Sequence, residues 1–294
     1  ENGTNLMWSF DEESGVLTIS GSGKMEDYTD QLHDEEPVGK KAPWDGYASQ
    51  IRKVVFEGSK IEIGDNAFYW KYTALTEVTG WENITVIGTN AFYRTSVSGM
   101  INLISAKKLK SYSFAQCYNS YILRVNSSCS IDDVGTGTPT MVIVKDGGSA
   151  GEWQEVAVGI FKDERIVMLT ANLPVLKVGY LYSNQENVPT GLYRLYYPEG
   201  EAESYSQWGK YQYYDSEKKS WFKDGEPIRI PLTHHEAKVA SCSETGNKEY
   251  WSYTEDGVEK YFDEDGNDAE SVEQFVIPKE PHQYDETYTC TVCK

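Results

Sequence analysis

Apolar residues recur at a fixed interval in the first part of the chain, with turn residues between them. Phe68, Phe92 and Phe114 end three related phrases, Ile-Gly-Asp-Asn-Ala-Phe, Ile-Gly-Thr-Asn-Ala-Phe and Leu-Lys-Ser-Tyr-Ser-Phe, and stand 24 and 22 residues apart. A period of this length is typical of solenoids, in which a short strand and a turn stack on the next copy. The pattern predicts a repeat array whose three phenylalanines stack in one column.

A second set of apolar residues keeps the same phase. An apolar residue stands 17 residues before each phenylalanine, and another follows three residues later. These residues are Ile51, Leu75 and Val97, followed by Val54, Val78 and Met100. Residues 51–56 are therefore expected to form a strand with alternate side chains turned inward, and Ile122 with Val125 the strand of a fourth, unfinished rung.

The residues of the repeated phrase suit a turn. Gly64 and Gly88 are expected at backbone positions with positive φ, and the amides of Asn66 and Asn90 can pair with turn backbone. The third copy replaces glycine, asparagine and alanine with Lys110, Tyr112 and Ser113. Such erosion is typical of the end of an array, where one side faces water.

The phrase resembles the BspA-type leucine-rich repeats of bacterial surface proteins, which carry Ile-Gly-x-x-Ala-Phe and often a cysteine soon afterwards, here Cys117. The stretch with Trp8, residues 15–28 and Pro43-Trp44 is similar to the β-hairpin cap that precedes such arrays in surface proteins of Gram-positive gut bacteria. The resemblance covers about residues 1–130. It implies an exported, non-catalytic protein that functions in binding or adhesion.

The repeat register is lost after about residue 138, where Gly, Thr and Pro suggest a boundary. We expect a mainly β chain with an N-terminal β-hairpin cap in residues 1–50 and a leucine-rich-repeat solenoid in residues 51–138. Short β-branched and aromatic runs predict an all-β, sandwich-like domain in residues 139–232. Residues 233–294 resemble a small C-terminal module of the same surface proteins, although residues 252–257 lack its usual Cys-x-x-Cys pair.

Two regions are candidate binding surfaces. The first is the row of strand positions expected to face outward in the array, which stacked repeats would present as a shallow ribbon. Its residues are Lys53, Val55, Glu77, Thr79, Gly99, Ile101 and Arg124. The second is the aromatic stretch 205–222, with Trp208 and Tyr211, which could be a platform for glycans or peptides or could be the core of a hairpin.

The five cysteines are too few for a dense disulfide framework. Cys117 is expected in the core of the array, and Cys129 could be reduced or bridged. A zinc site of Cys242, Cys290, Cys293 and His235 fits Cys-x-x-Cys spacing. The same residues also fit a reduced pair, a strained local disulfide or the first half of a further module, so the sequence assigns no metal and no cofactor.

The composition narrows the class of partner. The formal net charge of −19 disfavours nucleic acid and membrane surfaces, and the 46 carboxylates and four histidines form no recognisable catalytic motif. We therefore expect a non-enzymatic, extracellular cell-surface protein, with its export signal already removed, that binds a host or bacterial surface protein or a glycan. The alternatives are a glycan-binding or wall-associated module centred on the aromatic stretch, and a purely structural stalk.

Overall fold

The computed structural model describes residues 5–29, 39–132, 139–154, 156–158, 164–284 and 290. The chain divides into two compact units, the first made of Glu1–Leu195 with Glu203–Ile228 and the second of Tyr196–Ala202 with Arg229–Lys294. Strands dominate both units, and α1 (Ala202–Tyr205) is the one α-helix among the described residues. The prediction of a mainly β chain is confirmed.

The first unit begins with the hairpin that the sequence predicted. Strand β1 (Leu6–Asp11) pairs antiparallel with β2 (Val16–Lys24), which then pairs in parallel with β3 (Lys53–Ile63). A 3₁₀ turn, η1 (Asp45–Tyr47), precedes β3. Every pairing beyond β2 in this sheet is parallel, so the parallel strands of the array stack on the second strand of the hairpin.

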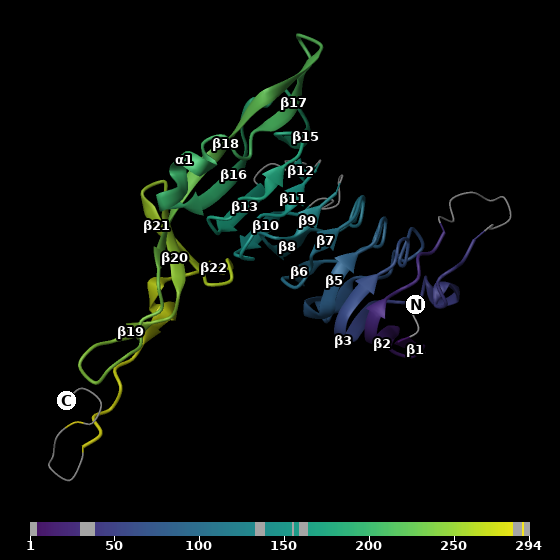
Figure 1. Ribbon diagram of the computed structural model, residues 1–294, viewed down its shortest axis with the longest axis horizontal. Helices are drawn as coiled ribbons and strands as arrows, with labels where there is room; N and C mark the ends of the chain where they lie inside the picture. Colours follow the sequence, from purple (N-terminus) through teal and green to yellow (C-terminus); the bar gives the residue numbers. More distant parts are fainter. Residues whose placement is uncertain are drawn as a thin grey trace. The chain divides into compact units, whose positions relative to one another are not determined.

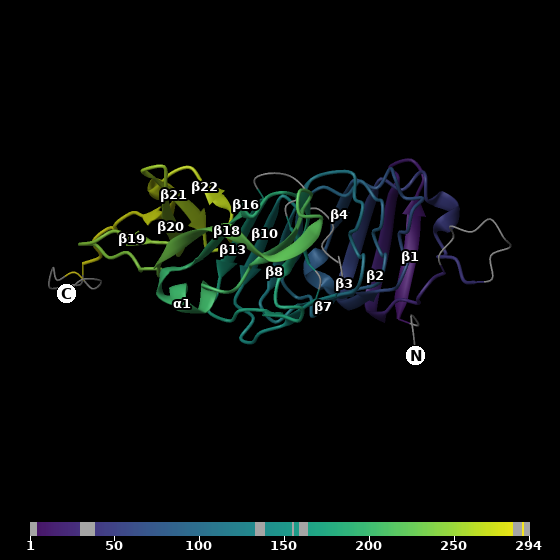
Figure 2. The same cartoon turned by 90° about the horizontal axis from the view of Figure 1, so that it is seen from above.

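The array builds two sheets (Figures 1 and 2), and from β6 onward each rung gives one short strand to each of them. The first sheet continues from β3, which also pairs with β4 (Glu77–Thr79), through β5 (Ile84–Ile87), β7 (Lys108–Leu109), β9 (Ser130–Ile131), β11 (Glu152–Trp153) and β14 (Val175–Leu176). The second contains the parallel strands β6 (Gly99–Leu103), β8 (Tyr121–Asn126), β10 (Met141–Lys145) and β13 (Glu164–Leu169). A 3₁₀ turn, η2 (Trp81–Asn83), lies before β5.

The parallel stacking crosses the boundary predicted at residue 138. Strand β8 pairs with β10 and β10 with β13, so residues 139–176 add rungs to the array rather than beginning a sandwich. Ile131, Trp153 and Leu176 face one another across successive rungs, 22 and 23 residues apart. The spacing between strands continues after the phenylalanine phrase is lost. A boundary predicted from that phrase alone was therefore placed too early in the chain.

The phenylalanine column is present as predicted. Phe68 and Phe92 stack at 5.1 Å between ring centroids, Phe92 and Phe114 at 5.4 Å, and all three side chains are fully buried. Trp44 stacks on Phe68 at 5.7 Å and donates its indole N–H to the carbonyl of Ala67. The Trp44 ring therefore covers the N-terminal end of the column.

The left-handed residues of the turns are asparagines, which corrects the assignment to glycine. Asn66 and Asn90 have φ of 58° and 54°, whereas Gly64 and Gly88 are not among the residues with positive φ. A Cβ on Gly64 would lie 1.8 Å from the carbonyl oxygen of Glu26, so these glycines allow neighbouring rungs to approach closely. Asn66 donates its amide to the carbonyl of Tyr28 at 2.7 Å, as the sequence predicted for this side chain.

The first unit ends in strands that lie beside the last rungs. These are β12 (Ala157–Val158), β15 (Leu181–Glu186), β16 (Thr190–Pro198), β17 (Tyr211–Asp215) and the first part of β18 (Ser220–His235). Strands β17 and β18 form a hairpin whose tip protrudes from the array (Figure 1). The turn η3 (Glu199–Glu201) precedes α1.

The second unit is a small antiparallel sheet with a two-stranded extension. The last residues of β18 pair with β20 (Tyr250–Glu255), followed by β21 (Val258–Asp263) and β22 (Asp268–Ala269). Tyr253 packs on Phe262 with ring centroids 4.9 Å apart. After η4 (Val272–Phe275), β23 (Val276–Ile277) pairs with β19 (Gly246–Asn247). The buried Phe275, directly before β23, stacks on Tyr250 with ring centroids 4.6 Å apart.

Candidate functional site

The predicted ribbon begins as expected on β3 and β4. Lys53 lies opposite Glu77 and Val55 opposite Thr79, and the Lys53 ammonium lies 2.5 Å from the Glu77 carboxylate. Glu77 is exposed and the other three side chains are half-buried. Because Lys53 and Glu77 neutralise one another, this part of the ribbon offers little unpaired charge to a partner.

The ribbon does not continue along later strands. The prediction that Ile101 and Arg124 face outward is wrong. Gly99 has φ of 80°, and after it the buried residues of β6 are Ile101 and Leu103, while Met100 is half-buried. A change of phase by one residue reverses the two faces of a strand. Arg124 lies on the face opposite Leu123 and is itself only 7% exposed. Neither side chain is available to a partner.

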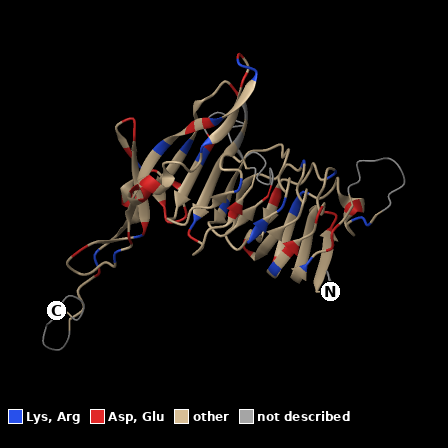
Figure 3. Ribbon diagram, turned by 45° about the horizontal axis from the view of Figure 1, so that its top comes forward, with Lys and Arg blue, Asp and Glu red and all other residues tan. Residues whose placement is uncertain are grey.

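Charges of opposite sign also pair between rungs on the first sheet, where Figure 3 shows basic and acidic residues on neighbouring strands. Lys108 lies 3.1 Å from Asp132, Lys177 lies 2.6 Å from Glu152, and Lys110 lies 2.9 Å from Asp65. Each such exposed pair contributes only about 0–1 kcal/mol to stability. In each of these pairs, charges of opposite sign lie side by side on the array.

A cluster of aromatic rings and one guanidinium lies at the turns that follow the phenylalanine column. We call Tyr69, Trp70, Tyr93 and Arg94 the turn-edge cluster. Tyr69 stacks on Tyr93 at 5.2 Å, and the Arg94 guanidinium carbon lies 3.9 Å from the centre of the Trp70 ring. Trp70 is 36% exposed, while Tyr93 and Arg94 are half-buried. Tryptophan, tyrosine and arginine are the residues that most often dominate protein interfaces.

The backbone beneath the turn-edge cluster is strained. Trp70, Arg94 and Gln116, each two residues past a column phenylalanine, have φ of 62°, 59° and 54°. Non-glycine residues in this region cost about 1–2 kcal/mol each, and glycine or asparagine would cost less. Strained residues collect at functional sites, so this outlier points to a role for the side chains. Listing the residues that follow each phrase would have found the cluster in the sequence.

Trp208 and Tyr211, the other predicted site residues, are core residues. Trp208 is 7% exposed, donates its indole N–H to the carbonyl of Pro174 at 2.8 Å and packs edge-on against Trp153. Tyr211 is fully buried, and its hydroxyl accepts the backbone N–H of Leu192 at 3.3 Å. These rings cover the last rungs of the array, which would otherwise expose apolar surface.

One aromatic pair of the same stretch does face solvent. Trp221 is 47% exposed and lies 5.2 Å from the half-buried Tyr214, on the protruding β17–β18 hairpin. The proposed aromatic platform therefore keeps one exposed ring, Trp221, beside the half-buried Tyr214, and neither is one of the two that the sequence singled out.

Cys117 and Cys129 are interior residues of the array. Cys117 is 8% exposed, which confirms its predicted core position, and Cys129 is fully buried and not in a disulfide. Burial raises the pKa of the Cys117 thiol to about 11 and that of Cys129 to about 12. Both thiols are therefore protonated at neutral pH and unsuited to nucleophilic chemistry.

Of the four residues proposed for zinc, the structure describes three, and His235 is not grouped with the two cysteines. His235 stacks on Tyr250 and lies 2.9 Å from the Ser252 hydroxyl, so it is engaged on the sheet of the second unit. Cys293 lies outside the described residues. Cys242 and Cys290 do meet, with their sulfur atoms 3.4 Å apart.

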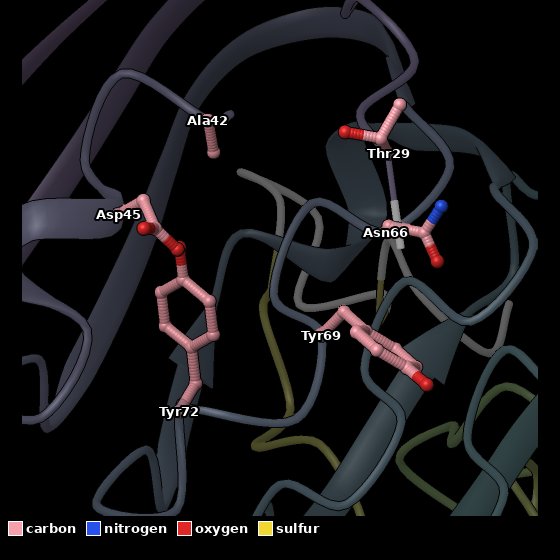
Figure 4. Close-up of a pocket in the computed structure, with 6 residues that line it drawn as sticks. All are labelled: Thr29, Ala42, Asp45, Asn66, Tyr69 and Tyr72. Carbon is pink, nitrogen blue, oxygen red and sulfur yellow. The ribbon is translucent and has the colours of Figure 1, made fainter. Parts of the chain in front are cut away.

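A small hollow lies beside the first rung, between Asp45, Asn66, Tyr69 and Tyr72 (Figure 4). The Tyr72 hydroxyl points toward Asp45 and has no hydrogen-bond partner among the described residues. Burial raises the pKa of Tyr72 well above its ordinary value, and the Asp45 carboxylate adds to the effect. The hollow has room for about one water molecule, so it is not a substrate site.

The comparison with protein families agrees with the repeat geometry. Residues 47–133 match the family model described as BspA type leucine rich repeat region, in six copies. This part of the chain is similar to the BspA-type repeat regions. The BspA-type match ends at residue 133, whereas the parallel rungs continue to Leu176.

Searches of curated proteins and of solved structures found no match. In the part of the chain that the structure describes, none of the helices has the length and apolar character needed to cross a membrane. The BspA-type region is consistent with a surface protein that binds other molecules, and leucine-rich repeats commonly mediate protein interactions. Which surface binds, and what it binds, are taken up next.

Proposed function

We propose that this chain is part of an exported surface protein of a Gram-positive gut bacterium, and that it binds a host or bacterial surface protein through the turn-edge cluster. The protein acts by binding or adhesion and catalyses no reaction. The observation that carries the proposal is the exposed Trp70 ring with the Arg94 guanidinium 3.9 Å above it, held on strained turns of a BspA-type array.

The chemistry of the cluster supports a protein ligand. Trp70 and the half-buried Tyr93, which stacks on it, supply rigid apolar area at little cost in conformational entropy. The exposed part of Arg94 can donate hydrogen bonds to carboxylates or carbonyls of a partner. A cation over an aromatic face contributes about 0.5–1 kcal/mol at exposed sites, which orders both side chains before a partner arrives. The cluster is small, so one copy would bind modestly and many copies on a cell would be needed for adhesion.

The exposed Trp221, with the half-buried Tyr214 beside it, supports a second candidate, glycan binding by the β17–β18 hairpin. Sugars stack their apolar faces on exposed indole and phenol rings. In this alternative the array is a spacer that holds the hairpin away from the cell. The turn of this hairpin has one non-glycine residue with positive φ, Lys219, whereas the array repeats such residues at successive turns, so we rank the pair second.

Binding of the chain to immobilised mucosal glycoproteins, their deglycosylated forms and bacterial wall polysaccharides, measured as one panel, separates these candidates. The double variant Trp70→Ala/Arg94→Ala should lose binding by about tenfold or more, since hot-spot residues contribute about 1.4 kcal/mol or more each. The matched double variant Lys53→Ala/Glu77→Ala, which removes an exposed ion pair of the same array, should bind as the native chain does. Thermal unfolding of each variant controls for stability.

The same panel can also contradict the proposed binding site. If Trp70→Ala/Arg94→Ala binds normally, the turn-edge cluster is not the site. Loss of binding in Trp221→Ala alone, to components that lose activity when glycans are removed, would transfer the function to the hairpin.

A further inference from the structure

Three metal-ligating side chains converge in the second unit, away from the turn-edge cluster. The ligand atoms of Cys242, His282 and Cys290 all lie within 4.8 Å of one another. Both cysteines are buried, at 6% and 9% exposure, while the His282 ring is exposed. The set joins residues 48 positions apart in the chain, so it is a product of the fold rather than of a local motif.

We propose that Cys242, His282 and Cys290 bind a structural zinc ion. Zinc takes thiolate sulfur at about 2.3 Å and imidazole nitrogen at about 2.0–2.1 Å in tetrahedral geometry, which places neighbouring ligand atoms about 3.4–3.8 Å apart. The two sulfur atoms are 3.4 Å apart, and the whole set falls within 4.8 Å. The separations in the set therefore lie within about 1 Å of those that zinc requires, and the three side chains fill three of its four tetrahedral positions.

Sulfur and imidazole ligands select zinc over the hard cations calcium and magnesium, which prefer oxygen. Residues 233–294 contain five basic and 15 acidic residues, so a cation enters a favourable field. Cys293 follows Cys290 at Cys-x-x-Cys spacing but lies outside the described residues, and the proposed site does not depend on it.

The surrounding fold needs a cross-link of this kind. Among the described residues of 236–249 and 276–290, the buried side chains are those of Ala240, Cys242 and Cys290. Secondary structure is limited to the β19–β23 pair, two isolated bridges and a hydrogen bond from the Glu280 amide to the Ser241 carbonyl at 3.0 Å. Segments with so little core commonly depend on a metal or a disulfide for their stability.

The three proposed zinc ligands lie on the same two segments that the few backbone hydrogen bonds connect, the one before β19 and the one after β23. Cys242 lies between the β bridge at Lys238 and strand β19, and His282 and Cys290 flank the bridge residue Tyr284. Zinc at this point would hold the segment after β23 against the segment before β19. Removal of the metal should therefore loosen this end of the second unit and leave the repeat array unchanged.

Zinc content of the full chain, purified under reducing conditions and dialysed against buffer with trace zinc, tests the proposal. We expect about one zinc per chain by mass spectrometry for a complete site. His282→Ala removes an exposed ligand without opening the interior and should lower the zinc content at least fivefold. Cys242→Ser should do the same.

Matched variants act as controls. His234→Ala alters a histidine of the same unit that pairs with Glu249, and Cys129→Ser alters a buried cysteine of the array. Both should retain the full zinc content. With cobalt in place of zinc, the native chain should show thiolate-to-cobalt charge-transfer absorption, and Cys242→Ser should lose much of it.

Three results would overturn the proposal. One is a native, reduced chain that binds no zinc or cobalt. Another is His282→Ala retaining the same zinc content as the native chain. The third is peptide mapping of chain prepared without reductant that finds a Cys242–Cys290 disulfide both with and without added zinc. None of these measurements depends on the ligand of the turn-edge cluster.

Discussion

Two backbone positions in each turn of the array adopt the left-handed conformation, and they are filled by different kinds of residue. Asn66 and Asn90 occupy the first, where the asparagine side chain both tolerates positive φ and bonds to the rung before it. Trp70 and Arg94 occupy the second, where neither advantage applies. The first position therefore serves the fold, and the second exposes side chains that we assign to binding.

The first position predicts a graded response to substitution. Asn90→Ala loses the 3.2 Å contact between its amide and the Asn66 side-chain oxygen and forces a Cβ into the left-handed region, so it should cost about 1–2 kcal/mol. Asn90→Gly loses the same contact without the strain and should cost less. Urea unfolding measures both free energies. A glycine variant less stable than the alanine variant would contradict the assignment of asparagine to the strained position.

Asp146 connects two rungs by its charge. Its carboxylate accepts hydrogen bonds from the Asn172 amide at 2.8 Å, from the Gly148 amide and from the Thr170 hydroxyl. These bonds, that of Asn172 first, lower the pKa of Asp146 below its ordinary value. A group with a lowered folded-state pKa stabilises the fold above its ordinary pKa of about 3.9 and loses that effect as the pH falls through the lower value.

Acid should therefore loosen this junction in the native chain. Thermal unfolding followed from pH 6 to pH 3 should show a smaller decrease for Asp146→Asn than for the native chain, because the variant has no charge to lose. The effect should be small, since the carboxylate is exposed. Equal decreases in the two proteins would show that Asp146 does not contribute to the acid sensitivity.

The phenylalanine column is the element that makes the rungs depend on one another. Phe92 stacks on both Phe68 and Phe114, with interplanar angles of 14° and 3°, and Trp81 packs edge-on against it. If a fully buried ring in the middle of a stack is removed, water cannot enter the space it leaves, and movement of one neighbour cannot fill it. This central position predicts a large loss of stability on truncation.

Phe92→Ala should destabilise the first unit by about 3–5 kcal/mol, the range for removing a buried aromatic ring. Phe92→Leu, which refills most of the volume, should lose well under half of that. Tyr118→Ala, at a 58% exposed aromatic residue of the same repeats, is the control and should change little. Denaturant unfolding of the three variants gives the comparison, and a Phe92→Ala effect no larger than that of Tyr118→Ala would reject the stacked column.

Features that repeat along the chain could be predicted from the sequence, and features that occur once could not. The phenylalanine column and the buried Ile51, Leu75 and Val97 were predictable because three copies set one phase. The rungs of Ile131, Trp153 and Leu176 share spacing but no phrase, so their continuation needed the strand pairing. Ile101 and its partner Leu123 on the next strand are both buried, so the inward phase differs here from the one that the repeated phrase predicted.

The candidate sites depended on tertiary contacts and were therefore less predictable. Aromatic residues suit a core and a binding platform equally well, and Trp208 became core because Trp153 lies 5.7 Å from it. Cys242 and Cys290 could be grouped by type, but the choice of His282 over His235 depends on which strands pair. Sequence identified the kind of residue in each case, and the fold decided its neighbours.

At the scale of the whole molecule, one array carries both the predicted ribbon and the turn-edge cluster, while the hairpin offers a rival surface. The partner's footprint distinguishes them directly. Hydrogen exchange of the chain, alone and saturated with whichever panel component binds it, should slow in residues 66–72 and 90–96. Slowing confined to residues 211–222, or to residues 53–55 and 77–79, would contradict binding through the turn-edge cluster.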